Sequence, residues 1–217
     1  TSPPLFHLVQ RNDPELNMKL RVLTIATVAA CCSLVSPLAQ TPTVDRAALA
    51  ASVKAEFLHA WNGYKKYAWG HDDFDPVSKK PGDWYPPEVI YMTPVDSLDT
   101  MLIMGLKEQA AEAQAIILEK LSFDKDISVQ LFEVNIRILG GLLSAYEMTG
   151  EKRFLTLAED LGRRLLPAFK SKTGMPYRYV NLRTGAVRDG VNNPAEIGTL
   201  ILEFGTLSRH TGNKAFF

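Results

Sequence analysis

The most informative part of the chain is residues 131–146, Leu-Phe-Glu-Val-Asn-Ile-Arg-Ile-Leu-Gly-Gly-Leu-Leu-Ser-Ala-Tyr. It predicts one helix that is apolar on nearly every face, and helices of this kind are normally buried. The same stretch nevertheless contains Glu133 and Arg137. Because a charge removed from water is costly unless it is paired or used, Glu133 is the first candidate for catalysis.

The polar and glycine positions of this helix share one side. At about 100° per residue, Glu133, Arg137, Gly140, Gly141 and Ser144 lie on a single stripe. Two adjacent glycines inside a helix each cost about 1 kcal/mol relative to alanine, so we expect a second helix or a ligand close to the backbone. The spacing of Glu133 and Arg137 alone favours a structural ion pair over a catalytic role, because i,i+4 is the ordinary geometry of a helical ion pair.

Composition bounds the class of protein. The chain has 217 residues, 46% of them hydrophobic, and a formal net charge of +0, which fits one domain with a sizeable core. No basic stripe or arginine-rich run is present to contact a phosphate backbone. The sequence therefore argues against a nucleic-acid partner.

The N-terminal region predicts export. Residues 18–39 have the charged start and short apolar run of a signal peptide, with cleavage expected after Ala39. The apolar run is too short for a membrane span of about 20 residues. Alternatively, residues 28–31 resemble a lipobox, which would attach a lipid to Cys31. We predict a secreted or periplasmic protein, with residues 1–17 as an upstream extension and residues 40–217 as the domain.

From Val44 onward the hydrophobic periodicity is helical almost everywhere. A proline- and glycine-containing loop is expected between residues 76 and 87, and a short β-hairpin between residues 177 and 187, turning near Thr184-Gly185. Thr93 is the expected N-cap of the second helix, because Pro94 and Asp96 follow it. The predicted helices are 44–67, 94–105, 107–121, 128–148, 151–169 and 194–210.

Such helices, joined by short turns, predict stacked antiparallel pairs. The apolar residues 215–217 would leave one face of this array uncovered. We therefore expect the domain to be truncated at its C-terminus.

The candidate functional side chains are carboxylates and aromatic rings. Trp69 and Trp84 lie in a loop rich in aspartate, where they suit either sugar stacking or packing. A capping role at the helix N-terminus would explain Asp96 without any function. Asp99 has no such role, so it is either paired or functional. Glu196 also fits a capping role. No metal-ligand spacing, phosphate-binding loop or serine or cysteine nucleophile motif is present, which leaves the groups used in glycoside hydrolysis.

Several motifs, in order, resemble those of the class I α-mannosidases, glycoside hydrolase family 47. The clearest are Asp-Ser-Leu-Asp at 96–99, Phe-Glu-x-x-Ile-Arg at 132–137 and Ala-Glu-Ile-Gly at 195–198. Further matches fall in residues 59–72, 158–162 and 176–182. The resemblance covers roughly residues 50–217, about the N-terminal half or less of the family's catalytic domain.

The resemblance implies an all-α fold, an (α/α)7 barrel of helical hairpins, here only its N-terminal portion. It also implies a hydrolase that removes terminal α-1,2-linked mannose with inversion and uses Ca²⁺. Glu133 corresponds to the candidate general acid and Asp96 to an active-site aspartate, while Arg137 and Glu196 correspond to substrate contacts. The proton of Glu133 could pass directly or through a water molecule.

Several expectations follow from this resemblance. Asp99, Trp69 and Trp84 are further candidates for contacting the substrate, a mannose-containing oligosaccharide. The general base and a calcium-binding threonine are expected beyond Phe217, so we expect no metal ligand here and no mannosidase activity from these 217 residues alone.

We expect a monomer with no membrane contact beyond a possible lipid anchor. The alternatives are a non-catalytic relative that binds mannose glycans and a helical interaction scaffold.

Overall fold

The computed structural model describes residues 15, 18–19 and 44–217. The chain divides into two compact units, residues 1–50 and 51–217, and the fold below is that of the second. The predicted cleavage site at Ala39 and the predicted lipid attachment at Cys31 lie outside the described residues. Within the part of the chain that is described, no helix is long and apolar enough to cross a lipid bilayer.

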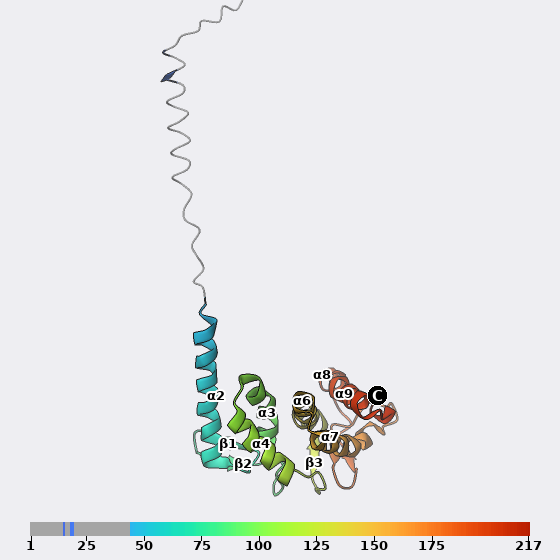
Figure 1. The fold of residues 1–217 in the computed structure, drawn as a ribbon. Coiled ribbons are helices and arrows are strands. Elements are labelled where there is room, and N and C mark those ends of the chain that lie inside the picture. The colour runs from blue at the N-terminus through green and yellow to red at the C-terminus, as the bar shows by residue number, and fades with distance from the viewer. Residues whose placement is uncertain (1–14, 16–17, 20–43) are drawn as a thin grey trace, which may run out of the picture. The chain divides into compact units, whose positions relative to one another are not determined.

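Helices make up most of the described chain, as the periodicity predicts, and short connections join them (Figure 1). The longer helices are α2 (Arg46–Ala68), α3 (Met92–Met104), α4 (Lys107–Lys120), α6 (Gly140–Thr149), α7 (Lys152–Leu165) and α9 (Ile201–Thr211). The shorter ones are α5 (Leu131–Val134) and α8 (Pro194–Gly198), together with a π-helical turn η1 (Asn135–Leu139) and the 3₁₀ turns η2 (Leu166–Phe169) and η3 (Lys214–Phe216).

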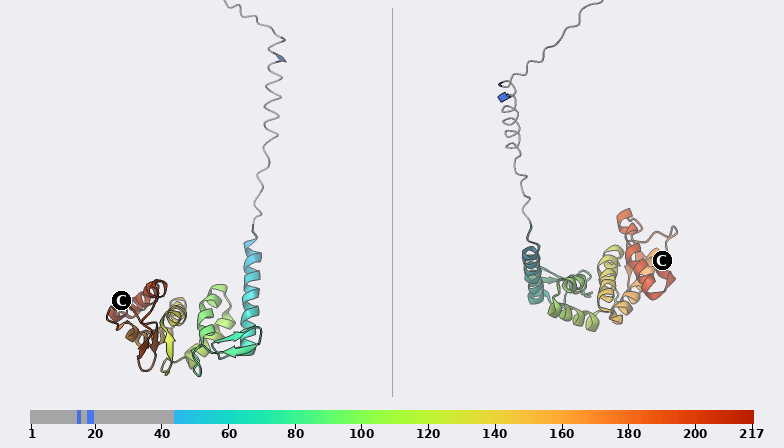
Figure 2. Two further views of the ribbon diagram at one scale, coloured as in Figure 1. Left: turned by 180° about the vertical axis from the view of Figure 1, so that it is seen from behind. Right: turned by 45° about the horizontal axis from the view of Figure 1, so that its top comes forward.

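Helix α6 lies between two helix pairs, α3 with α4 and α7 with α9 (Figures 1 and 2). Gly141 explains how closely α6 approaches α3. A Cβ atom added at this position would lie 2.7 Å from Val95 Cγ1 and 3.0 Å from the Val95 carbonyl oxygen. The close neighbour that the Gly-Gly step predicts is therefore confirmed at Gly141, and it is a helix.

The N-terminus of α3 differs from the prediction. The helix begins at Met92, with Tyr91 in the left-handed region (φ 55°) and no side-chain cap from a neighbour in sequence. Asp72, which is fully buried, replaces the expected Thr93 cap, because its Oδ1 accepts hydrogen bonds from the backbone N–H groups of Ile90 (2.8 Å) and Met92 (3.2 Å). The cap thus comes from a residue about 20 positions earlier, which a local motif cannot indicate.

The predicted helix over residues 128–148 is wrong at its start. Residues 128–130 form the strand β3 (Ser128–Gln130), and helical structure begins only at Leu131. β3 pairs antiparallel with β4 (Tyr179–Asn181), which places Val129 opposite Val180. Both valines are fully buried, so burial against a distant strand overrides the helical periodicity of this segment.

The predicted hairpin near Thr184-Gly185 is confirmed. β4 pairs with β5 (Val187–Arg188), and Gly185 adopts a φ of 71° in the turn, so the hairpin and β3 form a three-stranded sheet. A second hairpin, β1 (Asp73–Asp75) with β2 (Lys80–Gly82), lies where only a loop was predicted. The predicted last helix is also interrupted, because α8 ends at Gly198 and α9 starts at Ile201.

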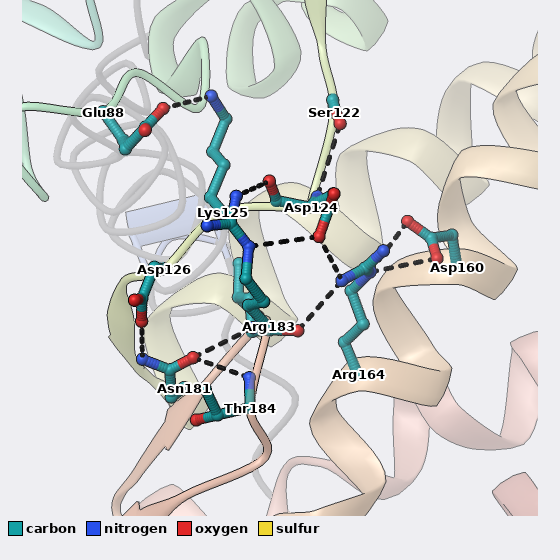
Figure 3. A network of polar contacts seen from close by, with 11 residues as sticks. Glu88, Ser122, Asp124, Lys125, Asp126, Asp160, Arg164, Asn181, Arg183 and Thr184 are labelled. Carbon is teal, nitrogen blue, oxygen red and sulfur yellow. Dashed lines mark hydrogen bonds and ion pairs between the residues drawn. The ribbon is translucent and has the colours of Figure 1, made fainter.

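A polar network joins residues 181–184 to residues 124–126 at one end of the three-stranded sheet, which we call the outer end (Figure 3). Arg183 donates from Nη2 to the carbonyl oxygen of Asp124 at 2.7 Å, and Asn181 donates to Asp126 Oδ1 at 2.8 Å. Arg164 on α7 donates to the carbonyl oxygen of Leu182 at 3.0 Å. These contacts fix the hairpin to α7 and to the segment that leads into β3.

Candidate active site

Arg137 joins the candidate acid to a second helix. Its Nε donates to Glu133 Oε2 at 2.8 Å, as the i,i+4 spacing predicts, and its Nη1 donates to Asp96 Oδ2 on α3 at 3.1 Å. The side chains of all three residues are between 24% and 37% exposed. The fold thus brings Asp96, Glu133 and Arg137 into one polar group, which we call the Arg137 cluster, at a surface that a ligand can reach.

The backbone that carries this cluster is irregular. Glu133 lies in α5 and Arg137 in the π-helical turn η1, and such turns often occur at functional sites. Asn135, between them, is fully buried and donates from Nδ2 to Glu203 Oε2 on α9 at 2.6 Å. Burial raises the pKa of the Glu203 carboxyl above its ordinary value, although the Asn135 hydrogen bond opposes this. The π-helical turn η1 is therefore held against α9 by the buried side chain of Asn135.

Trp84 lies beside the Arg137 cluster. The guanidinium carbon of Arg137 is 5.3 Å from the centre of the Trp84 ring, a cation–π distance. Trp84 Nε1 donates to Asp73 Oδ2 at 2.9 Å, and its backbone N–H donates to the buried Asp72 at 3.0 Å. These bonds fix the orientation of a ring that remains 38% exposed, so Trp84 is available as a stacking surface next to the cluster.

Trp69, by contrast, is not brought to the cluster. Its ring makes edge contacts with Trp61 and Tyr64 of α2, and Lys65 Nζ lies 5.8 Å from the ring centre. It lines a groove together with residues of α4, among them Glu112. Trp69 is 39% exposed, so it packs against α2 on one side and faces this groove, away from the Arg137 cluster, on the other.

Asp99 lies one helical turn after Asp96 on α3. Its Oδ2 accepts a hydrogen bond from the Ser144 hydroxyl on α6 at 3.0 Å. The stripe that the sequence predicts from Glu133 to Ser144 therefore faces the aspartates of α3 at both of its ends. Asp99 also raises the pKa of Asp96 through charge repulsion.

Asp96 has a perturbed ionisation. Burial raises the pKa of its carboxyl above the ordinary value, against the lowering effect of the Arg137 hydrogen bond and charge. Glu133 accepts the Arg137 hydrogen bond on Oε2, and no described residue donates a side-chain hydrogen bond to Oε1. Oε1 of Glu133 is thus open to a further hydrogen-bond partner.

Glu196 is held by a different set of residues. Arg178 donates to it through two nitrogens, Nη2 to Oε1 at 2.9 Å and Nε to Oε2 at 3.2 Å. Asn193 Nδ2 adds a bond of 2.9 Å and Gln130 Nε2 one of 3.4 Å. The capping role that the sequence suggests belongs to Asn193, whose Oδ1 accepts the Glu196 backbone N–H at 2.9 Å. The Glu196 carboxylate is therefore free of that role.

Sequence reasoning missed the residues that hold Glu196. Arg178 lies at the start of a predicted hairpin and Gln130 in a segment predicted as helix, and neither position carries a local signal. Their relevance arises only because β3 and β4 pair and place Gln130 opposite Tyr179, the neighbour of Arg178.

The described residues do not form a complete metal site. Among them, no group of three or more His, Cys, Asp or Glu side chains is placed to hold a metal ion. Ca²⁺ usually takes six to eight oxygen ligands. The Arg137 cluster does not fit this requirement, because its two carboxylates are already paired with a guanidinium.

The chain is similar to proteins of known activity. Residues 56–217 match the model of glycosyl hydrolase family 47. The endoplasmic reticulum mannosyl-oligosaccharide 1,2-alpha-mannosidase of Homo sapiens is 48% identical over 164 residues, which are 74% of this chain and 23% of that protein. Mannosyl-oligosaccharide 1,2-alpha-mannosidase MNS1 of Arabidopsis thaliana is 44% identical over 170 residues, 76% of this chain and 30% of that protein.

A solved structure shows the same fold. The alpha-1,2-mannosidase from Trichoderma reesei matches with a TM-score of 0.69 and 34% identity, over 77% of this chain and 38% of that one. This likeness confirms the prediction of a portion of an (α/α)7 barrel. The chain spans between 23% and 30% of the length of the two curated relatives above. With a family model matched over residues 56–217, the chain belongs to glycosyl hydrolase family 47.

Proposed function

We propose that this chain supplies one wall of the active site of a hydrolase that removes terminal α-1,2-linked mannose from mannose-rich oligosaccharides. The observation that carries the proposal is the Arg137 cluster, in which one guanidinium holds Glu133 and Asp96 together beside the Trp84 ring. Membership of glycosyl hydrolase family 47 and similarity to the two mannosidases support the same activity.

In this proposal Glu133 is the general acid. Its Oε1 can hold the proton that the departing glycosidic oxygen requires, while Arg137 fixes the side chain through Oε2. An inverting enzyme separates its acid and base by roughly 6.5–9.5 Å, which leaves room for a water molecule. The proton of Glu133 passes either directly or through such a water.

The remaining residues bind and orient the sugar. Asp96 holds Arg137 from α3 and has its own raised pKa, so it can hold a proton or accept a sugar hydroxyl. Arg137 has further N–H groups for hydroxyl oxygens, and Trp84 offers an apolar face for the C–H side of a mannose ring. Glu196 and Asp99 are acceptors for other hydroxyls, and Trp69 stays a weaker candidate.

Calcium, location and assembly are further proposals. When bound, Ca²⁺ would contact sugar hydroxyls, and the described residues do not provide a complete ligand set for it. The human relative is named for the endoplasmic reticulum, and an exported location for this protein is consistent with the predicted signal peptide. We propose that the protein acts as a monomer.

The experiment measures mannose release from α-1,2-mannobiose by a full-length protein that contains residues 44–217 and the rest of the catalytic domain, as wild type and as Glu133→Gln. Loss of a general acid typically costs about 10²–10⁴-fold in rate, so we expect a kcat lower by that factor with little change in KM. Retention of full activity by Glu133→Gln would contradict the acid assignment. Binding of the disaccharide without release would favour the non-catalytic glycan-binding alternative.

A further inference from the structure

Arg178 contacts both parts of the candidate site. Its carbonyl oxygen accepts a hydrogen bond from the backbone N–H of Leu131, the first residue of α5, at 2.9 Å. Its own backbone N–H donates to the carbonyl oxygen of Asp189 at 3.0 Å, which continues the pairing of the hairpin. The backbone of Arg178 therefore connects the sheet to the beginning of the helix that carries Glu133.

The side chain of the same residue holds Glu196. The two nitrogens that it donates, at 2.9 and 3.2 Å, meet the two carboxylate oxygens separately, which is the fork geometry that arginine forms and lysine cannot. The Glu196 side chain is only 13% exposed, whereas that of Arg178 is 37% exposed. The carboxylate is thus largely enclosed by its donors and has one orientation.

We propose that Arg178 is a positioning residue that fixes the Glu196 carboxylate relative to the start of the helix carrying Glu133. This inference rests on the proposed function, in which Glu196 contacts the glycan. One residue performs both tasks, so the spacing between the two carboxylates does not depend on the long connection through α6 and α7. The glycan-binding surface is preorganised as a result, and less ordering is needed when a sugar binds.

Stability alone does not account for this arrangement. The Glu196 carboxylate also accepts hydrogen bonds from Asn193 and Gln130, so burying it does not require the two-nitrogen contact from Arg178. Arg188, on the neighbouring strand β5, shows how an arginine of this sheet behaves without such a task, because its guanidinium carbon stacks 3.8 Å from the centre of the Tyr179 ring. Arg188 is therefore a matched control in the same hairpin.

Binding of α-1,2-mannobiose is measured by calorimetry for the wild type, for Arg178→Met and Arg178→Lys, and for the control Arg188→Met. The same measurement is made for Glu196→Gln and for the double variant Arg178→Met/Glu196→Gln. We expect Arg178→Met to weaken binding about tenfold, Arg178→Lys to recover part of the loss, and Arg188→Met to bind as the wild type does. The double variant should bind no more weakly than Glu196→Gln alone, because both changes act through one carboxylate. Additive losses, or equal affinities of Arg178→Met and the wild type, would overturn the proposal.

A second readout separates this proposal from the proposed function. The ¹³C resonance of the Glu196 carboxyl is measured at neutral pH in Arg178→Met and in Arg188→Met, without any sugar. We expect a shift in the first variant and none in the second. If the wild type does not bind mannobiose, the proposed function fails, and the positioning of Glu196 by Arg178 is decided by this resonance: an unchanged resonance in Arg178→Met overturns it.

Discussion

The two ends of the β3–β4–β5 sheet carry the same kinds of side chain and use them differently. At the outer end, Arg183 and Arg164 donate to main-chain carbonyl oxygens of Asp124 and Leu182, in addition to carboxylates (Figure 3). At the opposite end, residue 178 precedes β4 and residues 131–137 follow β3, and we call this the site end. Here Arg178 and Arg137 donate their side-chain hydrogen bonds to carboxylates.

The acceptors of each guanidinium indicate the role of each end of the sheet. A guanidinium on a carbonyl oxygen joins two backbone segments, so the outer end holds loops together. A guanidinium on partly exposed carboxylates keeps charged groups oriented near the surface, where a polar ligand can use the remaining donors and acceptors. We therefore propose that the outer end serves the fold and the site end serves recognition.

The largest contrast should come from Arg137→Met at the site end, measured against Arg183→Met at the outer end. The first change removes a charged donor and leaves Glu133 and Asp96 without their shared cation. Hydrogen bonds to charged groups contribute about 1.5–3 kcal/mol, which corresponds to a loss of mannobiose affinity of about 10- to 100-fold. Calorimetric titration measures this, and an equal loss in Arg183→Met would remove the distinction between the ends.

How far the sequence predicts these two ends depends on separation along the chain. The Glu133–Arg137 pair is local, so i,i+4 spacing indicates it directly. The Asp96–Arg137 pair joins residues 41 positions apart, and the chain's own spacing gives no sign of it. Resemblance to a family placed both residues in one site, whereas the Arg178–Glu196 pair, 18 positions apart, becomes visible only in the structure.

The same limit applies to the fold. The sequence predicts α2, α4 and α7 within a few residues of their observed ends. The strand β3 and the π-helical turn η1 were not foreseen, since both depend on tertiary contacts. The buried Asp72, which caps α3 from a distance, belongs to the same class.

The second prediction concerns the adjacent glycines that support the site end. Gly141→Ala would place a methyl group 2.7 Å from Val95 Cγ1, and such overpacking typically costs about 1–3 kcal/mol. Gly140→Ala is the control, because its nearest contact would be an ordinary 3.5 Å to Glu203 Cγ, and alanine favours helix by up to about 1 kcal/mol. Urea unfolding should show the first variant destabilised and the second unchanged or more stable.

The third prediction is a pH dependence at the site end. Because burial raises the pKa of the Asp96 carboxyl, folded protein retains a proton that the unfolded chain releases above its ordinary pKa of about 3.9. The stability contributed by this group is therefore complete below that value and is lost as the pH rises through the raised pKa.

We expect the stability of the wild type relative to Asp96→Asn to fall as the pH rises from about 3.5 towards neutrality. Urea midpoints at several pH values measure this difference, in which the other titrating groups cancel. Asp124→Asn at the outer end is the control. A wild-type advantage that grows with pH would show that Arg137, and not burial, dominates the environment of Asp96.

The smallest effect is expected at the outer end. Asp124 is 66% exposed in its ion pairs with Arg164 and Arg183, and pairs of this kind contribute about 0.2–1 kcal/mol. Asp124→Ala should lower the free energy of unfolding by no more than that, with mannobiose affinity unchanged. A tenfold loss of affinity would show that the outer end takes part in recognition after all.

The assignment of the Arg137 cluster as the glycan-binding wall is tested most directly by mapping backbone and tryptophan indole chemical shifts during titration with α-1,2-mannobiose. We predict that the Trp84 indole and the backbone amides around Glu133, Arg137 and Glu196 shift together with one dissociation constant. Residues 181–184 and 124–126 at the outer end should not move. Shifts confined to the outer end, or to Trp69 and α4, would contradict the assignment of the Arg137 cluster as the glycan-binding wall.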